Sequence, residues 1–599
     1  MSVTPLAATP TVDAVSLGLV RGSLMASIEE LGSLIARTSM SPFINEKHDY
    51  LVGFATASGQ FVALDSPTMA GINLVRPVLE QYDEAEIRAG DLYWFNDAYL
   101  TRGTITHSPD MVFVAPAFLG EDLIGYCACF GHFWDIGGLR PGSLSADARE
   151  IFHEGFLVPP VRIVKQGVWN DELFRTILRN SRFPEFMEGD VRALTAATHL
   201  GVERLRELAN RFGRDTTVEA CEQLVEQSAQ ILRRQLCEKV PNGTTRFGDR
   251  VDGDSSSDRA SPIRLQLKRD GDTFVLDTSE SGDQAAGPIN LLMDDSIPMV
   301  ILAQALAVDD RSVLLNGGAN ALLDEVIKRS GSLLAPRFPA PLGSRGVTLR
   351  VLGAALQGLL AIATGGQCAA ASPAYGIYVL RTVDQDSGRA VLCTDGLAVG
   401  RGGRPDSDGP DAIYATAQQN FPCEYMESTF PVRMEEYAIH RDSGGAGLHR
   451  GGCGVVRQFR FIGERAELAV RLGNTQYPSW GVNGGKSANP GSAVVNPGTK
   501  DERVLAPMSD GNTLTCGDVV RIATTGGGGW GHPFDRDPMA VLSDVLDGFV
   551  SEEAALRDYG VALTLSGDDV DPVETKTVRT RQRPAVKMFH RGKYLDDMW

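Results

Sequence analysis

Residues 106–138 read T-H-S-P-D-M-V-F-V-A-P-A-F-L-G-E-D-L-I-G-Y-C-A-C-F-G-H-F-W-D-I-G-G. This stretch contains two apolar runs that predict β-strands, M-V-F-V-A-P-A-F and L-I-G-Y-C-A-C-F. His107 and Asp110 form an H-x2-D motif on the loop before the first run, and His132 falls at the end of the second. If the two strands are neighbours in a sheet, the three polar side chains come together. The stretch therefore predicts a sheet with a polar site at its edge.

The residue types at this edge are those that bind a catalytic divalent metal, because imidazole and carboxylate groups are its usual ligands. The chain has only nine histidines, and His107, Asp110 and His132 supply three candidate ligands. Asp49, in N-E-K-H-D-Y just before another strand-like run, is a candidate fourth. Two histidines and two aspartates suit zinc, manganese or iron alike. Because H-x2-D is a loose motif, hydrogen-bonded loop residues are the competing interpretation.

Four other residues near the motif are candidates for catalysis or substrate binding. Asp135 could orient an imidazole by accepting its N–H, or could be a turn aspartate before two glycines. Glu154, in H-E-G, could serve as general base, or could lie at the surface. Asn96 and Asp97 precede the motif and could form a turn or hold the substrate.

Composition excludes several classes of protein. A net charge of -19 and a pI of about 5.0 argue against a nucleic-acid surface, which needs a basic face. The first ten residues lack a signal-peptide pattern, and no run reaches the roughly 18 uninterrupted apolar residues of a membrane span. The nine scattered cysteines predict reduced thiols, with Cys127 and Cys129 the two that could lie near an active site. We therefore expect a soluble cytoplasmic protein.

Glycine is the compositional outlier, with 65 residues. Its clusters in the last third of the chain predict many tight turns between short strands. The cluster G-V-N-G-G-K-S at 481–487 is one residue short of a Walker loop, and T-G-G-G-G-W-G lacks the lysine. The sequence also has no G-x-S-x-G elbow. We therefore expect neither nucleotide binding by this chain nor a serine nucleophile.

The chain as a whole predicts a mixed α/β architecture of several lobes. Residues 12–38 read as a helix with one apolar face, residues 187–240 are strongly helical, and residues 390–535 read as glycine-punctuated strands. The predicted division is an N-terminal α/β lobe with the metal site (1–186), a helical segment (187–243), a mixed α/β segment (244–389), a glycine-rich β lobe (390–563) and a basic C-terminal tail (564–599).

The basic tail carries seven lysines or arginines and no acid between 575 and 594: Lys576, Arg579, Arg581, Arg583, Lys587, Arg591 and Lys593. Such a run is either a solvated arm or an arm that docks an acidic partner subunit. The sequence leaves both interpretations open.

Over roughly residues 12–562, an ordered set of motifs resembles the B-type subunits of the ATP-dependent hydantoinase, 5-oxoprolinase and acetone/acetophenone carboxylase group. The set is E-K-H-D, G-D-L-Y-W-F-N-D-A-Y, T-H-S-P-D, H-F-W-D-I-G-G-L-R-P-G-S, H-E-G-F-L-V-P-P-V, N-S-R-F-P, P-A-P-L-G, N-F-P-C-E-Y-M-E, D-S-G-G-A-G-L-H-R-G-G and T-G-G-G-G-W-G-H-P. The order of the pieces, rather than any one of them, makes the resemblance specific.

The resemblance implies a reaction divided between subunits of a hetero-oligomer. A separate A-type subunit with an actin-like ATPase fold, carrying ATP and Mg, phosphorylates the amide or enol oxygen of a small-molecule substrate. The B-type subunit then performs the second chemistry at a buried metal. Its ligands here would be Asp49, His107, Asp110 and His132.

The sequence also departs from the ring-opening members of this group. Many of them have a double histidine where this chain has His132 followed by Phe133, and another histidine in the segment written here S-P-T-M-A-G-I-N-L. This single-histidine form looks more like the carboxylase branch. Hydrolysis of a cyclic amide (hydantoin, 5-oxoproline or a lactam) and carboxylation of a ketone therefore both stay open. A non-catalytic scaffold subunit and an ATP-independent single-chain hydrolase are further alternatives.

Overall fold

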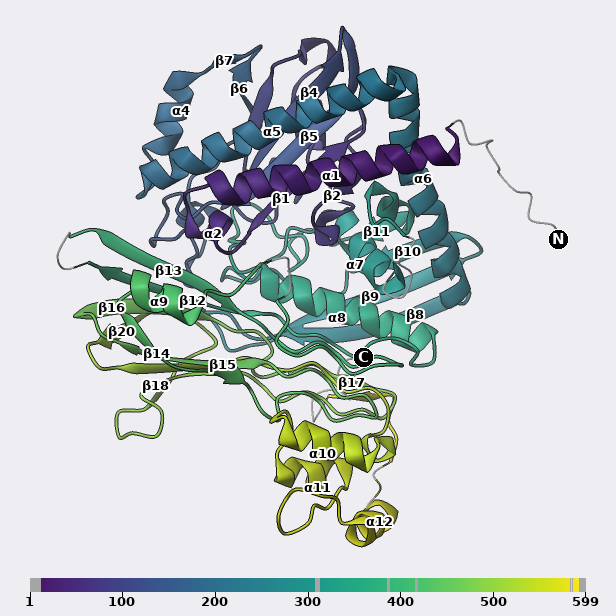
Figure 1. The fold of residues 1–599 in the computed structure, drawn as a ribbon, viewed down its shortest axis with the longest axis vertical. Coiled ribbons are helices and arrows are strands. Elements are labelled where there is room, and N and C mark those ends of the chain that lie inside the picture. The colour runs from purple at the N-terminus through teal and green to yellow at the C-terminus, as the bar shows by residue number, and fades with distance from the viewer. Residues whose placement is uncertain are drawn as a thin grey trace. The chain divides into compact units, whose positions relative to one another are not determined.

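The computed structural model describes residues 12–307, 313–384, 388–414, 418–581, 583 and 585–591 (Figure 1). The chain divides into two compact units. Unit 1 comprises Met1–Gly138, Glu154–Glu238 and Leu292–Asp324, and unit 2 comprises Leu139–His153, Lys239–Leu291 and Glu325–Trp599. The predicted mixed α/β architecture is confirmed, whereas the five-part division along the chain stays a prediction.

The helices of the described residues are α1 (Ala14–Thr38), α2 (Pro42–Asn45), α3 (Arg76–Gln81), α4 (Asp171–Leu178), α5 (Pro184–Phe212), α6 (Arg214–Lys239), α7 (Ser296–Ala307), α8 (Gly346–Ala363), α9 (Cys423–Thr429), α10 (Pro538–Leu546), α11 (Glu552–Tyr559) and α12 (Pro572–Arg581). Short 3-10 helices are η1 (Pro67–Met69), η2 (Glu84–Glu86), η3 (Ile151–Glu154), η4 (Gly317–Ala321) and η5 (Pro533–Asp535).

The strands are β1 (Tyr50–Ala55), β2 (Phe61–Leu64), β3 (Leu92–Phe95), β4 (Asp110–Leu119), β5 (Asp122–His132), β6 (Val161–Lys165), β7 (Val168–Trp169), β8 (Gly243–Val251), β9 (Ser261–Asp270), β10 (Thr273–Asp277), β11 (Glu325–Ile327), β12 (Gly376–Val383), β13 (Ala390–Leu397), β14 (Val432–Ile439), β15 (Val455–Phe461), β16 (Arg465–Arg471), β17 (Gly481–Val482), β18 (Ser492–Val495), β19 (Arg503–Val504), β20 (Met508–Thr515), β21 (Val519–Ala523) and β22 (Phe589–His590).

Unit 1 is built on a seven-stranded antiparallel sheet in the order β2-β1-β5-β4-β3-β6-β7. In Figure 1, α1 and α5 run side by side across one face of this sheet, and both contact its strands. The predicted helix of residues 12–38 is confirmed, because the side chain of Asp13 caps its start and its expected apolar face is buried. That face consists of Val20, Leu24, Ile28, Leu31 and Ile35.

The central strands β4 and β5 are covered on both faces, which explains their unbroken apolar sequence. Phe113 and Cys127 belong to the core cluster that contains the buried residues of α1 and α5, whereas Val112 and Ala128 belong to a second cluster. Because side chains alternate across a strand, each face needs its own apolar set. Cys127 and Cys129 are therefore buried core thiols, and both are free.

Unit 2 contains a four-stranded sheet β11-β10-β9-β8, a second sheet β13-β12-β16-β20, and a five-stranded sheet β14-β15-β21-β18-β19. Helix α8 packs against β8 and β9.

Among the described residues, α8 is the one helix long and apolar enough to cross a membrane by length and composition, and 61% of it is buried in the fold. A helix in the core of a water-soluble protein has the same composition.

The glycine clusters of unit 2 agree only in part with the expectation of tight turns, since Gly484 and Gly531 have positive φ angles but many of their neighbours do not. Gly400, Gly451 and Gly527 lack positive φ angles and lie where backbones of different segments touch. A Cβ atom would lie 1.7 Å from the carbonyl oxygen of Gly452 if placed on Gly400, and 1.9 Å from that of Gly527 if placed on Gly451. These three glycines let extended segments pack closely, because a glycine has no Cβ atom to collide with the neighbouring backbone. A positive φ angle is not what requires glycine at these positions.

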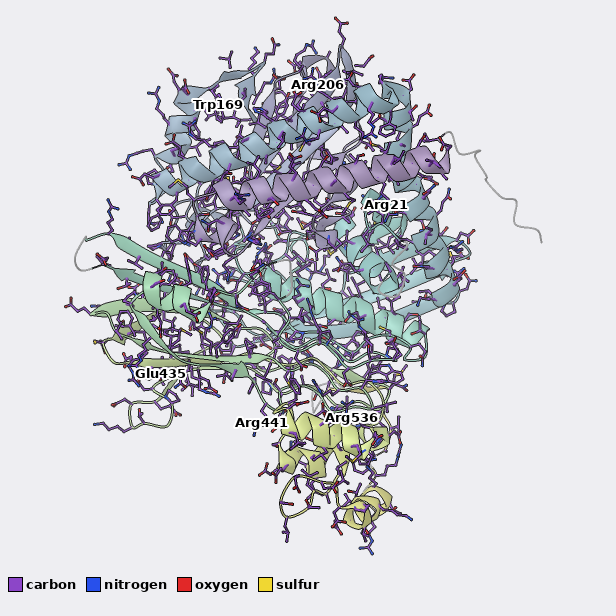
Figure 2. The ribbon with its side chains drawn as sticks, in the orientation of Figure 1. Arg21, Trp169, Arg206, Glu435, Arg441 and Arg536 are labelled. Carbon is purple, nitrogen blue, oxygen red and sulfur yellow. The ribbon has the colours of Figure 1, made fainter. Side chains whose placement is uncertain are left out.

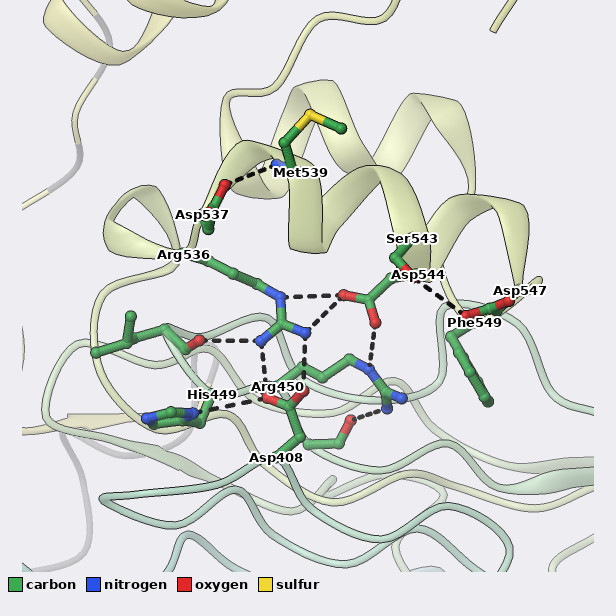
Figure 3. A network of polar contacts seen from close by, with 12 residues as sticks. Asp408, His449, Arg450, Arg536, Asp537, Met539, Ser543, Asp544, Asp547 and Phe549 are labelled. Atoms are coloured by element: carbon green, nitrogen blue, oxygen red, sulfur yellow. Dashed lines mark hydrogen bonds and ion pairs between the residues drawn. The ribbon is translucent and has the colours of Figure 1, made fainter. Parts of the chain in front are cut away.

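Charged side chains lie mainly on the outside of each unit, as Arg206 of α5 and Glu435 of β14 illustrate (Figure 2). An exception in unit 2, part of which Figure 3 shows, joins the buried side chains of Arg450, Arg536 and Asp544 to two partly exposed aspartates. Asp544 accepts from Arg450 Nε at 3.1 Å and from Arg536 Nε at 3.0 Å. Asp411 and Asp408 pair with the outer nitrogens of Arg450 and Arg536, respectively. The network links α10 to the glycine-rich segments before it.

Replacing Asp544 with alanine should lower the free energy of unfolding of unit 2 by about 3–5 kcal/mol, because two buried guanidinium groups lose their shared carboxylate. Asp547→Ala is the matched control, since Asp547 caps the same helix but is exposed, and about 0.5 kcal/mol or less is expected there. Urea unfolding of the three proteins measures the difference. Equal effects of the two substitutions would contradict a stabilising role for the network.

The basic tail contacts its own unit. Arg583 pairs with Asp535 at 2.8 Å, and Arg591 is buried, with its guanidinium 4.1 Å from the ring centre of Phe247. Arg591 also donates to the carbonyl oxygen of Gly248 at 2.6 Å. The interpretation as a solvated arm is therefore wrong at Arg591, because burial of this side chain is compensated by a hydrogen bond and cation–π contacts. Lys593 lies outside the described residues, and docking of an acidic partner stays a prediction.

Candidate metal centre

The sheet of unit 1 brings His107, Asp110 and His132 together. Strand β4 begins at Asp110, β5 ends at His132, and these two residues are direct partners in the antiparallel ladder. His107 lies in the turn that leads into β4. Asp110 Oδ1 lies 2.9 Å from His107 Nε2 and 3.0 Å from His132 Nδ1. The three candidate ligand atoms all lie within 4.8 Å of one another.

Asp49 approaches the same group from the neighbouring strand. It directly precedes β1, which pairs with β5, and its Oδ2 lies 3.9 Å from His132 Nδ1. The backbone N–H of His132 donates to the carbonyl oxygen of Asp49 at 2.9 Å. Three adjacent strands thus position the four residues that the sequence predicted as ligands.

The centre is buried, with His107, His132 and Asp110 exposed by 2%, 4% and 8%. Burial acts to raise the pKa of Asp110, but the adjacent imidazoles of His107 and His132 hold it well below its usual value. The ring of Phe43 stacks on that of His132 at 4.6 Å. Two imidazole nitrogens and a carboxylate oxygen that converge in a dry site are the donor set of a zinc, manganese or iron ion, so the residues fit a divalent metal.

Asp190 of α5 secures the segment that carries Phe43 and Asp49. It is buried, and its Oδ1 accepts from the backbone N–H groups of Met40 at 2.8 Å and Ser41 at 3.0 Å. Burial raises the pKa of Asp190 to about 6, although these hydrogen bonds oppose the shift. No pattern of residues in the sequence predicts these hydrogen bonds, because Asp190 lies 150 positions from Met40 and 149 from Ser41.

The raised pKa of Asp190 predicts a pH-dependent stability. Its unfolded-state pKa is about 3.9, so folding favours the protonated form, and that contribution is lost as pH rises from about 4 to about 6. Asp190→Asn keeps an acceptor oxygen and has no charge to desolvate. The variant should therefore gain stability relative to the wild type by about 3 kcal/mol over this pH range. Urea unfolding at several pH values measures it, and a pH-independent difference would contradict the argument.

Asp135 and Glu154 are both buried. Asp135 accepts from the backbone N–H groups of Gly137 and Arg182 and from Arg182 Nη1, at 2.9–3.0 Å. Glu154 ends η3, and burial of Tyr99, with the charge of Glu154 as a further cause, raises the pKa of Tyr99. Glu154 is thus a buried carboxyl near a phenol rather than a surface glutamate. The predicted roles of Asp135 at an imidazole and of Glu154 as a base stay predictions.

Asn96 and Asp97 have mainly local or backbone partners. Asp97 Oδ1 accepts from the backbone N–H groups of Tyr99 and Leu100, which is the turn expected as one alternative. Asn96 is fully buried, and its amide binds backbone groups of three other residues. Substrate contact by either residue stays a prediction.

The sequence interpretation missed Lys47, a fully buried lysine two residues before Asp49 in the motif E-K-H-D.

Comparison with known proteins gives a consistent result. The family model described as hydantoinase B/oxoprolinase matches residues 13–533. The putative B-type subunit of a D-/L-hydantoinase from a Pseudomonas species is 29% identical, with 95% of this chain and 98% of that protein covered. The beta subunit of the caprolactamase from Pseudomonas jessenii is also 29% identical, with 93% and 97% covered.

Two solved structures have the same fold. The crystal structure of the ATP-dependent caprolactamase from Pseudomonas jessenii matches with a TM-score of 0.84 and 25% identity, covering 95% of this chain and 100% of that one. A nucleotide-free structure of acetone carboxylase matches with a TM-score of 0.82 and 18% identity, covering 95% and 83%, respectively. The second likeness is evidence of the fold alone.

Proposed function

Because this chain belongs to the hydantoinase B/oxoprolinase family, we propose that it is the metal-dependent B-type subunit of an ATP-dependent multisubunit enzyme. The observation that carries the proposal is the convergence of His107 Nε2 and His132 Nδ1 on one carboxylate oxygen of Asp110 in a buried site. Asp49 is the proposed fourth ligand, because its Oδ2 lies 3.9 Å from His132 Nδ1. A bound zinc, manganese or iron ion would supply Lewis-acid chemistry at a carbonyl or enolate oxygen.

The chain's own residues supply the remaining functions. Burial of His107, Asp110 and His132 excludes bulk water from the reacting groups and strengthens their electrostatic effect. Glu154 is the proposed general base, since it is a buried carboxyl close to Tyr99. Asp135 is the second proposed catalytic group, with its carboxylate fixed by Arg182.

A separate A-type subunit with an actin-like ATPase fold is the proposed partner, which phosphorylates the substrate before the chemistry at the metal. Two relatives carry the names of single subunits, one B-type and one beta, and these names support a multisubunit assembly. The cytoplasm is the proposed compartment, because ATP is available there and reducing conditions would keep the nine free cysteines reduced.

Hydrolytic ring opening of a cyclic amide is the proposed reaction. The relatives named hydantoinase and caprolactamase support it, because hydantoins and caprolactam are cyclic amides. Carboxylation of a ketone is the second candidate. The single histidine of the His132-Phe133 pair favours it, since many ring-opening members of this group have a second imidazole at that position.

The test is bicarbonate dependence of the complex reconstituted from this chain and its ATPase partner. A cyclic-amide hydrolase should turn over hydantoin, 5-oxoproline or caprolactam with ATP at a rate that bicarbonate leaves unchanged. Turnover of acetone or acetophenone only in the presence of bicarbonate would instead establish carboxylation. Amide hydrolysis by this chain alone without ATP would contradict the two-subunit proposal.

A further inference from the structure

The side chain of Asn96 lies where two segments of the candidate metal centre meet. Asn96 directly follows β3 and is fully buried. Its Nδ2 donates to the carbonyl oxygens of Ser108 at 2.7 Å and Phe156 at 3.1 Å, and its Oδ1 accepts from the N–H of Val158 at 2.6 Å. We propose that Asn96 is a positioning residue that holds the His107 turn against the segment after Glu154 in the geometry required for metal binding.

The turn that carries His107 is held from two sides. On one side, the Asn96 amide binds the carbonyl oxygen of Ser108, the residue next to His107. On the other side, the carbonyl oxygen of Pro109 accepts from the N–H of Phe133, which follows the ligand His132. Because Ser108 and Pro109 lie between His107 and Asp110, movement at either contact changes the spacing of the two ligands.

The same amide fixes the segment after Glu154. The backbone N–H of Asn96 donates to the carbonyl oxygen of Val158 at 3.0 Å, so Asn96 and Val158 bind each other twice. Phe156, which also accepts from the Asn96 side chain, lies two residues after Glu154. With three hydrogen bonds to backbone groups and no exposed surface, Asn96 is placed to act on the centre through its neighbours.

Asn96→Asp tests this role with almost no change in volume. The new carboxyl can still accept from Val158, but one of its oxygens replaces the NH2 group that faces the carbonyls of Ser108 and Phe156. Repulsion there should displace the turn. Loss of a residue that orients metal ligands typically weakens metal binding about 10–100-fold, and we expect a change of that size.

Asn316 is a matched control in the same unit. It is also fully buried, its Nδ2 donates to the carbonyl oxygens of Val62 and Leu224, and its Oδ1 accepts from the N–H of Gly318. The bonding pattern therefore equals that of Asn96, but these contacts join β2, α6 and η4 rather than segments that carry ligands. Asn316→Asp should lower the melting temperature to a similar extent and leave metal affinity unchanged.

The experiment measures the Zn²⁺ affinity of the full-length wild type, N96D and N316D by competition with a chromophoric chelator, with thermal unfolding of each apoprotein recorded in parallel. A 10–100-fold weaker affinity in N96D, with wild-type affinity in N316D, supports the inference. Should N96D fail to fold, N96S takes its place, with N316S as its control; the shorter serine side chain loses the hydrogen bond to Ser108, so weaker binding is again expected.

The inference rests on the proposed metal centre, and the two can fail separately. Tight Zn²⁺ binding by the wild type with equal affinity in the Asn96 variant overturns the role of Asn96 and leaves the centre intact. Equal loss of affinity in the Asn96 and Asn316 variants also overturns it, because destabilisation alone then explains the change. Absence of Zn²⁺ binding by the wild type overturns both proposals.

Discussion

Replacing His107 with alanine should remove the bound metal and reduce turnover of the reconstituted complex on the order of 10³-fold or more, which corresponds to about 4 kcal/mol of transition-state stabilisation. His107 Nε2 lies 2.9 Å from Asp110 Oδ1 in a site almost without exposed surface. Its loss leaves a buried carboxylate with one imidazole neighbour fewer. Metal content by mass spectrometry should fall from about one ion per chain to near zero.

His199→Ala is the control for this substitution, because His199 lies exposed on α5 of the same unit. It should retain wild-type metal content and turnover. Metal retained in the His107 variant would show that the ion binds elsewhere. Unchanged turnover of the complex would favour the alternative in which this chain is a non-catalytic scaffold subunit.

Replacing Gly527 with alanine should prevent stable folding of unit 2, with a loss of about 4 kcal/mol or more in the free energy of unfolding. A Cβ atom on Gly527 would lie 2.1 Å from the backbone carbon of Arg401 and 2.4 Å from the nitrogen of Gly402. Backbone atoms cannot rotate away as the end of a flexible side chain can. Gly527 itself binds backbone groups of Gly445 and Gly452, so displacement would also break hydrogen bonds.

Gly22→Ala provides the contrast, because Gly22 lies exposed in α1 and nothing stands within 4 Å of its added Cβ. This substitution should stabilise the protein by about 0.5–1 kcal/mol through helix propensity. Yield of soluble protein and urea unfolding compare the two variants. A Gly527 variant as stable as the wild type would mean that the extended segments can separate at little cost.

The sequence predicts much of the candidate centre because its candidate ligands lie at or next to strand ends. The β4 and β5 strands are adjacent in the chain and their apolar runs are unambiguous, so antiparallel pairing brings Asp110 near the end of β5. The register shift between Ala117 and Phe118 is what places Asp110 directly opposite His132. Asp49 could be added because it precedes another strand. Its proximity depends on β1 pairing with β5, which is a long-range choice that periodicity does not contain.

Patterns in the sequence do not predict contacts between residues that are far apart in the chain. Asp190 binds Met40 from 150 positions away, and Arg591 inserts beside Phe247 from the far end of the chain. Glycine clusters predict turns because glycine often supplies positive φ, and Gly484 and Gly531 have it, whereas Gly400, Gly451 and Gly527 provide space between backbones instead. A single sequence does not distinguish these two uses of glycine.

The sequence alone predicts the α/β class, the apolar face of α1, the strands β4 and β5, and the residue types of the candidate metal centre. These features depend on local periodicity and on ligand chemistry, and both can be recognised from residues that lie close together in the chain. The fold, in contrast, places Asp49 Oδ2 3.9 Å from His132 Nδ1, lets Asn96 bind both the His107 turn and the segment after Glu154, and packs glycine backbone against backbone. Those features depend on which distant segments become neighbours, and that is decided by the packing of the whole core.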